Sequence, residues 1–270
     1  MLKLTLRRVT NEGVNFLSLK RRNIIKGLLA QKPFVSLQEL ETIFPDVSSM
    51  TLRRDIEYFE RLGDAIKVRG GARSMKFITN PLEDSFSKRL GENVDEKEKL
   101  AKHAATMIET GRSIFLDSGT TILRLAEILP NERITVTTAG VNIATELIKK
   151  DLPIVNVVGG MLNRDSLSLS GNQTLGFIEN INIDVAFMVP SGASVKGGLT
   201  CGNNIECELK KLVVEKAERV VVLMDSSKFD RSMPYTFCNI DRIDDIITDK
   251  PLPDGIKRLA DAGGVRVTVV

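Results

Sequence analysis

The chain has 270 residues, of which 42% are hydrophobic and 27% charged, and it is long enough for two domains with a substantial core. No apolar run approaches the roughly 20 residues of a membrane-spanning helix, and the N-terminus lacks the hydrophobic region of a signal peptide. We therefore expect a cytoplasmic protein with no membrane partner. The three cysteines provide neither a disulfide framework nor a zinc-ligand spacing, so we expect no metal and no cofactor.

Charge is unevenly distributed along the chain, although the net charge is only +3. Residues 1–76 hold 15 Lys and Arg against 8 Asp and Glu, whereas the remainder holds 23 against 27. A basic N-terminal module followed by a mildly acidic body is expected of a nucleic-acid binder with a separate second function. Residues 1–16 show no clear periodic pattern and fit either a flexible arm over DNA or an ordinary terminus.

The basic module begins with two predicted helices. Apolar residues recur at helical spacing over residues 17–30, and Pro33 ends this pattern. Ser36 and Glu39 have the spacing of a capping box ahead of a second helix over residues 37–44. Pro45 and Asp46 then favour a tight turn, which leads into a third helix.

The third helix is predicted to begin after Ser48, whose hydroxyl is a good N-cap. Leu52, Ile56 and Phe59 follow at helical spacing and are expected to form a buried stripe. The residues expected on the opposite side are Met50, Arg53, Arg54 and Glu57. Arginines on such a front can bond phosphates or guanine edges in a DNA groove. An ordinary amphipathic helix with a solvated face is the alternative for this stretch taken alone.

The neighbours of this helix favour DNA binding. Helix, helix, tight turn, helix is the helix-turn-helix arrangement, and residues 65–69 alternate apolar and basic side chains before Gly70 and Gly71. This pattern predicts a short hairpin, or wing, with two basic residues directed outward to DNA. We predict DNA contacts by Ser49, Met50, Thr51, Arg53, Arg54, Lys67 and Arg69.

The second part of the chain alternates short apolar strands with helices. We place a linker at about residues 73–85, a DNA-binding domain at 1–76 and a second domain at 85–270. Strands are expected at residues 114–116, 134–137, 154–158, 185–189, 220–224, 245–248 and 265–270, and helices at 96–109, 121–129, 141–150, 172–180, 204–217 and 255–262. This alternation predicts an α/β fold in which helices cover both faces of one sheet.

Ligands of such sheets bind beyond the carboxyl ends of the strands. The loop Asp117-Ser118-Gly119-Thr120-Thr121 joins the first predicted strand to its helix. Hydroxyls and free helix amides there can hold a phosphate, and the carboxylate can accept from sugar hydroxyls. The endings of a P-loop and of a dinucleotide fingerprint are absent. A simple capped turn is an equally good interpretation of this loop by itself.

The run from Thr51 to Ile56, together with Gly63 and the run from Arg69 to Ala72, resembles the winged helix-turn-helix signature of the DeoR family of bacterial sugar-operon regulators. The resemblance covers residues 18–250. In the second domain it includes Asp117-x-Gly-Thr-Thr and the run Asp225-Ser-Ser-Lys-Phe. Residues that depart from the family pattern are Arg69, where His is usual, Ala139, where Asn is common, and Val189, where Gly is usual.

The resemblance implies that the second domain is a sensor related in fold to phosphopentose isomerases, with a phosphorylated sugar as effector. The Gly-Thr-Thr loop would hold the phosphate, with lysines as cations and carboxylates facing hydroxyls. The implied effector residues are Asp117, Ser118, Gly119, Thr120, Thr121, Thr138, Glu206, Lys210 and Lys228. For Glu206 and Lys228, a surface ion pair or a helix-face charge is an equal alternative.

Two functions follow. The first is a transcriptional regulator, a repressor of a carbohydrate-utilisation operon, that binds double-stranded operator DNA as a homo-oligomer, either dimer or tetramer. The second is a sugar-phosphate isomerase or lyase with an accessory basic domain. In that alternative, the base would be Asp117, Asp184 or Glu206, and Lys228 would be the electrophile. The helix-turn-helix and wing favour the regulator.

Overall fold

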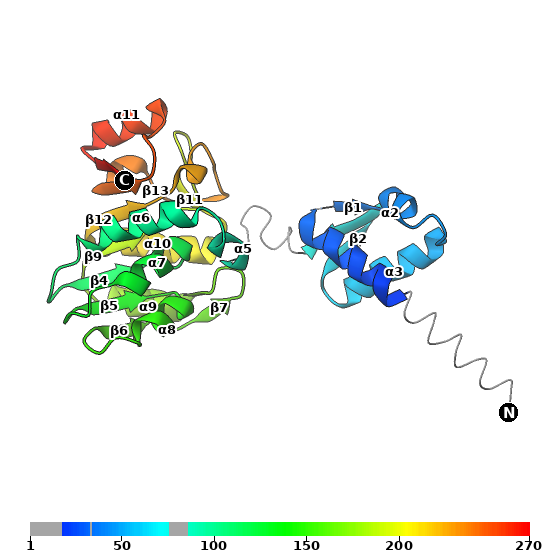
Figure 1. Cartoon of the computed structure of the whole chain (residues 1–270), viewed down its shortest axis with the longest axis horizontal. Helices are drawn as coiled ribbons and strands as arrows, with labels where there is room; N and C mark the ends of the chain where they lie inside the picture. Colours follow the sequence, from blue (N-terminus) through cyan, green and yellow to red (C-terminus); the bar gives the residue numbers. More distant parts are fainter. Residues whose placement is uncertain (1–17, 33, 76–85) are drawn as a thin grey trace. The chain divides into compact units, whose positions relative to one another are not determined.

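The computed structural model describes residues 18–32, 34–75 and 86–270, which belong to two compact units, residues 1–82 and 83–270 (Figure 1). The arm considered at residues 1–16 and most of the predicted linker, residues 76–85, lie outside the described residues. Arg73 and Ser74, which we expected in the linker, instead belong to a strand of the smaller unit.

The smaller unit is a winged helix-turn-helix. Its first helix occupies residues 18–31. The elements that follow are β1 (Phe34–Ser36), α2 (Leu37–Ile43), α3 (Ser49–Arg61), β2 (Ala65–Val68) and β3 (Gly71–Ser74). Both predicted caps are present, because Ser36 Oγ accepts from the Glu39 amide at 3.0 Å and Ser48 Oγ accepts from the Thr51 amide at 3.3 Å. These hydroxyls satisfy amides that have no partner within the helix.

The core of the smaller unit lies between its three helices and its sheet. Leu52, Ile56 and Phe59 of α3 are at most 3% exposed, as the helical spacing predicted. They pack with apolar residues of the first helix, α2 and the strands, including Ile25 and Leu40. One face of α3 is therefore fixed in the core, and the orientation of the opposite face is set by this packing.

The strand β1 was not predicted. It pairs antiparallel with β3, so the wing hairpin becomes a three-stranded sheet in the order β1-β3-β2. Gly71 is required at this junction, because a Cβ there would lie 2.2 Å from the carbonyl oxygen of Val35. This pairing links the wing to the residues that precede α2. No periodic pattern in the sequence of β1 predicts the pairing.

The larger unit is built on a seven-stranded parallel sheet in the order β15-β14-β12-β9-β4-β5-β6 (Figure 1). Its strands are β4 (Ser113–Leu116), β5 (Thr135–Thr138), β6 (Ile154–Val157), β9 (Ile183–Met188), β12 (Ala217–Leu223), β14 (Asp245–Thr248) and β15 (Arg266–Val269). Each corresponds to a predicted strand, with ends that differ by up to three residues.

Helices cover both faces of this sheet, as the alternation predicted. They are α6 (Val94–Ala105), α7 (Thr120–Ile128) and α8 (Val141–Leu147) on one face, and α9 (Asn172–Glu179), α10 (Asn204–Lys216) and α11 (Asp254–Gly263) on the other. Successive strand residues point to opposite faces. Accordingly, Ile114 and Leu116 of β4 pack in one apolar cluster, and Phe115 packs in the other.

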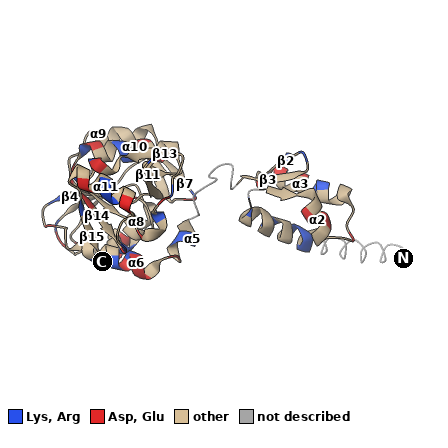
Figure 2. Cartoon of the chain, turned by 90° about the horizontal axis from the view of Figure 1, so that it is seen from above, with Lys and Arg blue, Asp and Glu red and all other residues tan. Residues whose placement is uncertain are grey.

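Several short elements were not predicted. They are the hairpin of β7 (Met161–Asn163) and β8 (Ser168–Ser170), the small sheet of β10 (Gly192–Ser194), β11 (Gly198–Cys201) and β13 (Tyr235–Cys238), and two 3-10 turns at Ser226–Lys228 and Ile240–Arg242. A short helix, α5 (Phe86–Leu90), precedes α6. No helix within the described ranges is long and apolar enough to cross a membrane. Acidic and basic residues are interspersed along the helices of the larger unit (Figure 2).

Candidate DNA-binding and effector-binding sites

The exposed face of α3 carries the predicted DNA-contacting residues. Met50 is 62% exposed, and Arg53 and Arg54 are also exposed, whereas Leu52 between them is fully buried. The two guanidinium groups are thus presented to solvent by a helix whose other face is fixed in the core. A single rigid face with adjacent arginines can approach phosphates and base edges in a DNA groove.

The predicted residues at the start of α3 have a supporting role. Ser49 Oγ donates to Glu41 Oε1 at 2.5 Å, which ties the first turn of α3 to α2. The Thr51 and Ser48 hydroxyls lie 3.0 Å apart, and Ser48 also caps the helix. These bonds hold the helix N-terminus, whose amides and dipole favour a nearby phosphate.

The wing is held against α3 by two acidic side chains. Lys67 Nζ pairs with Glu57 Oε1 at 2.6 Å, and the Lys67 amide donates to Glu60 Oε1 at 2.9 Å. The hydrogen bond and positive charge of Lys67 lower the pKa of Glu57. Arg69 lies exposed in the turn between β2 and β3. Both predicted basic wing residues are therefore at the surface, and because the Lys67 pair is exposed it can be exchanged for a phosphate at little cost.

Asp55 has a structural role that the sequence did not reveal. It lies on α3 only 1% exposed, and its two oxygens accept from Arg21 Nε at 2.5 Å and Arg22 Nε at 2.8 Å. Arg22 also lies over the Tyr58 ring, 3.9 Å from its centroid. These contacts fix α3 to the first helix. Arg21 and Arg22 therefore contribute to the packing of the smaller unit.

The predicted effector loop lies at the carboxyl edge of the parallel sheet, directly after β4. Asp117 is 2% exposed. One of its carboxylate oxygens accepts from the Ser118 amide at 2.8 Å, and the other accepts from the Val189 amide at 3.0 Å and from Lys210. Protein donors thus occupy the carboxylate that we expected to face sugar hydroxyls, and its observed role is to hold the loop.

Lys210 lies between two carboxylates. Its ammonium group bonds Asp117, donates to the Val189 carbonyl at 3.1 Å and lies 3.7 Å from Glu206 Oε1. Burial by itself lowers the pKa of Lys210, but Asp117 and Glu206 raise it by more, so it lies above its ordinary value. Glu206 is also contacted by Ser168 Oγ at 3.4 Å. The structure therefore brings Asp117, Glu206 and Lys210 together.

The start of α7 is suited to an anion. Its N-cap is Gly119, which provides no capping side chain, and Thr120 and Thr121 follow with buried hydroxyl-bearing side chains. Gly119 has φ +147°, and a Cβ there would lie 2.9 Å from a methyl of Val189, so glycine is needed at this position. Thr138, at the end of the neighbouring β5, accepts from the Gly140 amide at 3.0 Å. The amides of the first turn of a helix have no intrahelical acceptors.

A second polar cluster lies at the same edge of the sheet, after β12. Lys228 is in the 3-10 turn there, close to Lys97 of α6, whose pKa burial lowers to about 8. Asp225 is 1% exposed and accepts from the Asn93 side chain at 3.0 Å, and its second oxygen has no hydrogen-bond partner among the described residues. Since β9 separates β12 from β4, the two clusters are about 10 Å apart.

Asn142, in the first turn of α8, is a candidate that the sequence reasoning missed. Both polar atoms of its side chain are buried without a hydrogen-bond partner among the described residues. Ala139, where an amide was expected from the family pattern, is fully buried in the apolar core instead. A buried amide without partners is costly, and a ligand at this edge could satisfy it.

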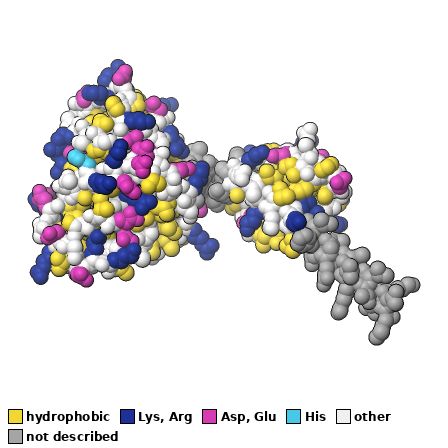
Figure 3. All heavy atoms as spheres, in the orientation of Figure 1, with side chains coloured by type: hydrophobic (Ala, Val, Ile, Leu, Met, Phe, Trp, Pro, Cys, Tyr) yellow, Lys and Arg dark blue, Asp and Glu magenta, His cyan; other side chains and the backbone are white. Residues whose placement is uncertain are grey.

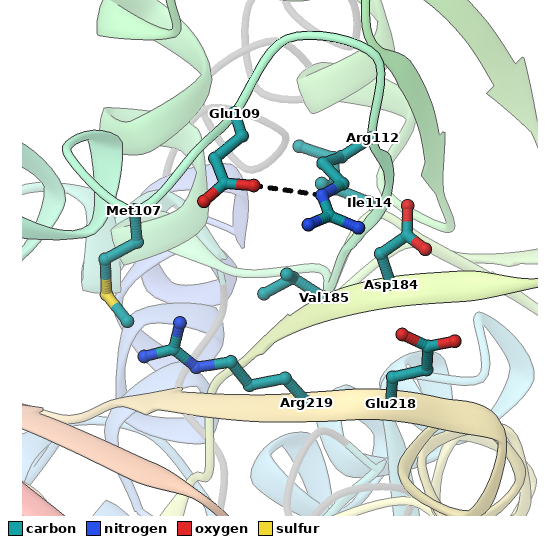
Figure 4. Close-up of a pocket in the computed structure, with 8 residues that line it drawn as sticks. All are labelled: Met107, Glu109, Arg112, Ile114, Asp184, Val185, Glu218 and Arg219. Atoms are coloured by element: carbon teal, nitrogen blue, oxygen red, sulfur yellow. Dashed lines mark hydrogen bonds and ion pairs between the residues drawn. The ribbon is translucent and has the colours of Figure 1, made fainter.

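Asp184 lies at the opposite edge of the sheet. It is at the start of β9, where it accepts from the Ser113 amide at 2.7 Å and lines a cavity of about 210 Å³ (Figure 4). Arg112, which pairs with Glu109, and Arg219 line the same cavity. β9 is six residues long, so roughly 16 Å of strand separates Asp184 from the Asp117 loop. The residues nominated for isomerase or lyase chemistry are therefore not assembled in one place.

The described residues contain no group of three or more His, Cys, Asp or Glu side chains arranged to hold a metal ion. Cys201, Cys207 and Cys238 are free thiols in the interior. The smaller unit is a winged helix with an exposed arginine face, and the larger unit is an α/β domain with polar residues at the carboxyl edge of its sheet. This combination in one chain is typical of a DNA-binding regulator with a separate sensor domain.

Comparison with known proteins identifies this regulator's family. Residues 21–77 match the model of the DeoR-like helix-turn-helix domain, and residues 92–250 match that of the DeoR C terminal sensor domain. The transcriptional regulator GolR of Listeria innocua is 36% identical over 251 residues, which is 90% of this chain and 96% of the relative. The chain belongs to the DeoR family of transcriptional regulators.

Two further proteins are similar to this chain. The glycerol-3-phosphate regulon repressor of Escherichia coli is 30% identical over 243 residues, 89% of this chain and 94% of the relative. The ribose 5-phosphate isomerase A structure from Methanocaldococcus jannaschii has a TM-score of 0.39 and 21% identity, covering 51% of this chain and 55% of that one. The α/β fold class and the family resemblance are confirmed, and the relatives are regulators, so the enzyme alternative is set aside.

Proposed function

We propose that this protein is a repressor of a carbohydrate-utilisation operon, and that a phosphorylated sugar at the carboxyl edge of the larger unit controls its DNA binding. The observation that carries the proposal is the α3 face on which Arg53 and Arg54 are exposed while Leu52, Ile56 and Phe59 are buried. Among the relatives is the glycerol-3-phosphate regulon repressor, whose name joins DNA control to a phosphorylated carbon source.

DNA recognition is assigned to the smaller unit, within the proposed domain of residues 1–76. In this proposal Arg53, Arg54 and Met50 face the groove, Lys67 and Arg69 of the wing bind phosphate, and Ser49 and Thr51 support the helix start. Support comes from the exposure of the basic side chains and from the bonds of the two hydroxyls to Glu41 and Ser48.

Effector binding is assigned to the larger unit, within the proposed domain of residues 85–270. The phosphate would sit on the first-turn amides of α7, with Ser118, Gly119, Thr120 and Thr121 around it and Lys228 as cation. Glu206, Thr138 and Asn142 would face the hydroxyl-bearing part of the sugar. Asp117 and Lys210 would orient the loop, since their charged groups bond each other.

This proposal predicts reciprocal coupling, because an effector that weakens DNA binding must itself bind more weakly to the DNA complex. The test is a gel-shift titration of the full chain on its own promoter fragment, with a panel of phosphorylated sugars, the matching unphosphorylated sugars and inorganic phosphate. One phosphorylated sugar is expected to release the DNA, whereas its unphosphorylated form does not.

Thr120→Val tests the position of the effector site. Thr and Val have nearly the same shape, so the hydroxyl is removed without a cavity. We expect this variant to bind the promoter normally and to require at least tenfold more sugar phosphate for release. Equal release of the variant and the natural protein would remove the effector from this loop. Release by no member of the panel would contradict effector control while leaving DNA binding intact.

A further inference from the structure

The seven-stranded sheet ends at β6, whose outer edge is paired with no other strand among the described residues. Backbone groups along an open edge are a template for another strand, and proteins protect such edges with charged residues, bulges or covering elements. From residue 152 to residue 163 the chain has no charged side chain. The β5–β6 register is also continuous. Neither a charge nor a bulge therefore protects β6, which is four residues long and follows Pro153.

Large apolar side chains lie exposed on and beside β6. Six of them are between 43% and 70% exposed, and we call them the β6-edge surface: Ile148, Leu152, Ile154, Val157, Met161 and Leu162. Hydrophobic side chains are visible around α8 and β7 in Figure 3. The other end of the sheet differs, because β15 carries Arg266 and its exposed large apolar residues are Val267 and Val269. Exposed apolar residues that gather in this way mark an interaction site.

We propose that the β6-edge surface pairs with the same surface of a second copy of this chain about a two-fold axis. A two-fold axis places two identical strand edges antiparallel, so that the donors and acceptors of one edge meet the acceptors and donors of the other. The partner of the β6 edge must therefore be another strand edge with matching spacing and apolar side chains. The β6 edge of a second copy has these two properties.

The charges around β6 fit a second copy. Lys149, Lys150 and Asp151 precede the strand, and the uncharged residues 159–163 follow it. In an antiparallel pair, the charged end of one copy lies beside the uncharged end of the other, so like charges are not brought together. Pairing of two copies through this surface does not depend on effector binding. A two-fold pair would also supply two α3 helices for an operator with two half-sites.

The test is sedimentation velocity of the full chain at micromolar concentration, comparing the natural protein with two lysine variants. Val157→Lys changes a β6 residue that is 44% exposed, and Val269→Lys changes a matched β15 residue that is 49% exposed. We expect the natural protein to sediment as two or more copies. Val157→Lys is expected to halve the mass and raise the dissociation constant on the order of 100-fold, because it places two like charges in an apolar interface. Val269→Lys is expected to leave the mass unchanged.

A monomeric natural protein would overturn the proposal, and so would a Val157→Lys variant of unchanged mass. Circular dichroism checks that each variant is folded. If Val157→Lys fails to fold, Ile148→Lys replaces it, because this residue lies outside the strand at the end of α8 and is 70% exposed. An unchanged mass for a folded Ile148→Lys variant would equally overturn the proposal. Each of these outcomes is separate from whether the protein binds DNA or a sugar phosphate.

Discussion

The buried lysine of the larger unit permits a sharp test of the site geometry. Lys210 and Lys211 are adjacent on α10, and each is ion-paired. The Lys210 side chain is 3% exposed and lies between Asp117 and Glu206, which are 2% and 8% exposed. Lys211 and its partner Glu208 are 50% and 49% exposed. Substitution by Met at either position removes the charge while keeping most of the apolar stem, so burial is the main difference between the two variants.

We expect Lys210→Met to lower the free energy of unfolding of the larger unit by about 3–5 kcal/mol, because it leaves two buried carboxylates without their cation. Lys211→Met is expected to change the stability far less than Lys210→Met, since an exposed pair is screened by water. For a unit of this size, the first change corresponds to a fall in melting temperature of roughly 6–20 °C. Scanning calorimetry of the full chain measures both.

The double variant Lys210→Met with Asp117→Asn supplies a check on the cause. Neutralising one of the two unpaired carboxylates is expected to restore part of the lost stability. The melting temperature of the double variant should therefore lie above that of Lys210→Met. Equal losses for the Lys210 and Lys211 variants would refute the reasoning. A double variant less stable than either single change would show that Asp117 acts through contacts other than the pair.

Three other buried groups, Asp55, Lys97 and Cys238, give further predictions. In chemical denaturation, Asp55→Ala should destabilise the smaller unit by about 3 kcal/mol, because Arg21 and Arg22 lose a buried partner. Glu57→Ala breaks an exposed pair and should have a much smaller effect. Burial lowers the pKa of Lys97 from 10.5 to about 8, so between these pH values the unfolded chain binds more protons. The natural protein should therefore gain stability relative to Lys97→Met as the pH rises from 8 to 10.5, by at most about 1.4 kcal/mol per pH unit, and a flat difference would contradict the assignment. Burial raises the pKa of the Cys238 thiol to about 11, so alkylation at pH 8 should be slow until the protein is unfolded, and rapid labelling of the native protein would count against this packing.

Local periodicity was sufficient for most of the fold. The spacing of Leu52, Ile56 and Phe59 predicted the buried face of α3, and these side chains are in the core. The alternation of apolar strands and helices predicted the strands of the seven-stranded sheet. In both cases the spacing of apolar residues within one element indicates which of its side chains are buried. The hydroxyls of Ser36 and Ser48 marked helix starts because a cap bonds amides two or three residues away.

Long-range contacts were beyond the reach of these patterns. The strand β1 has three residues and exists because it pairs with β3, about 37 residues further along the chain. The small sheet of β10, β11 and β13 is likewise made of short segments whose pairing is tertiary. Propensity over three or four residues is too weak to predict such strands.

The roles of charged residues in the sites were the least predictable feature. Asp117 was expected to face hydroxyls, but it accepts from two amides and Lys210, a residue 93 positions away. Asp55 directly follows two arginines in the sequence, but the fold shows that its buried charge pairs with two other arginines, which belong to the first helix. Whether a charge is solvated or paired depends on which elements meet, and the sequence leaves that open.

The central claim is that the arginine face of α3 contacts duplex DNA. The most direct measurement is fluorescence anisotropy of the full chain on its own promoter and on random DNA of equal length, for the natural protein, Arg54→Ala and Lys26→Ala. The two variants lose the same charge, but Lys26 lies on the first helix. We expect Arg54→Ala to weaken promoter binding at least tenfold and Lys26→Ala to change it less than threefold, with preference for the promoter kept in the control. Equal losses in the two variants, or equal affinity of the natural protein for both DNAs, would contradict the claim.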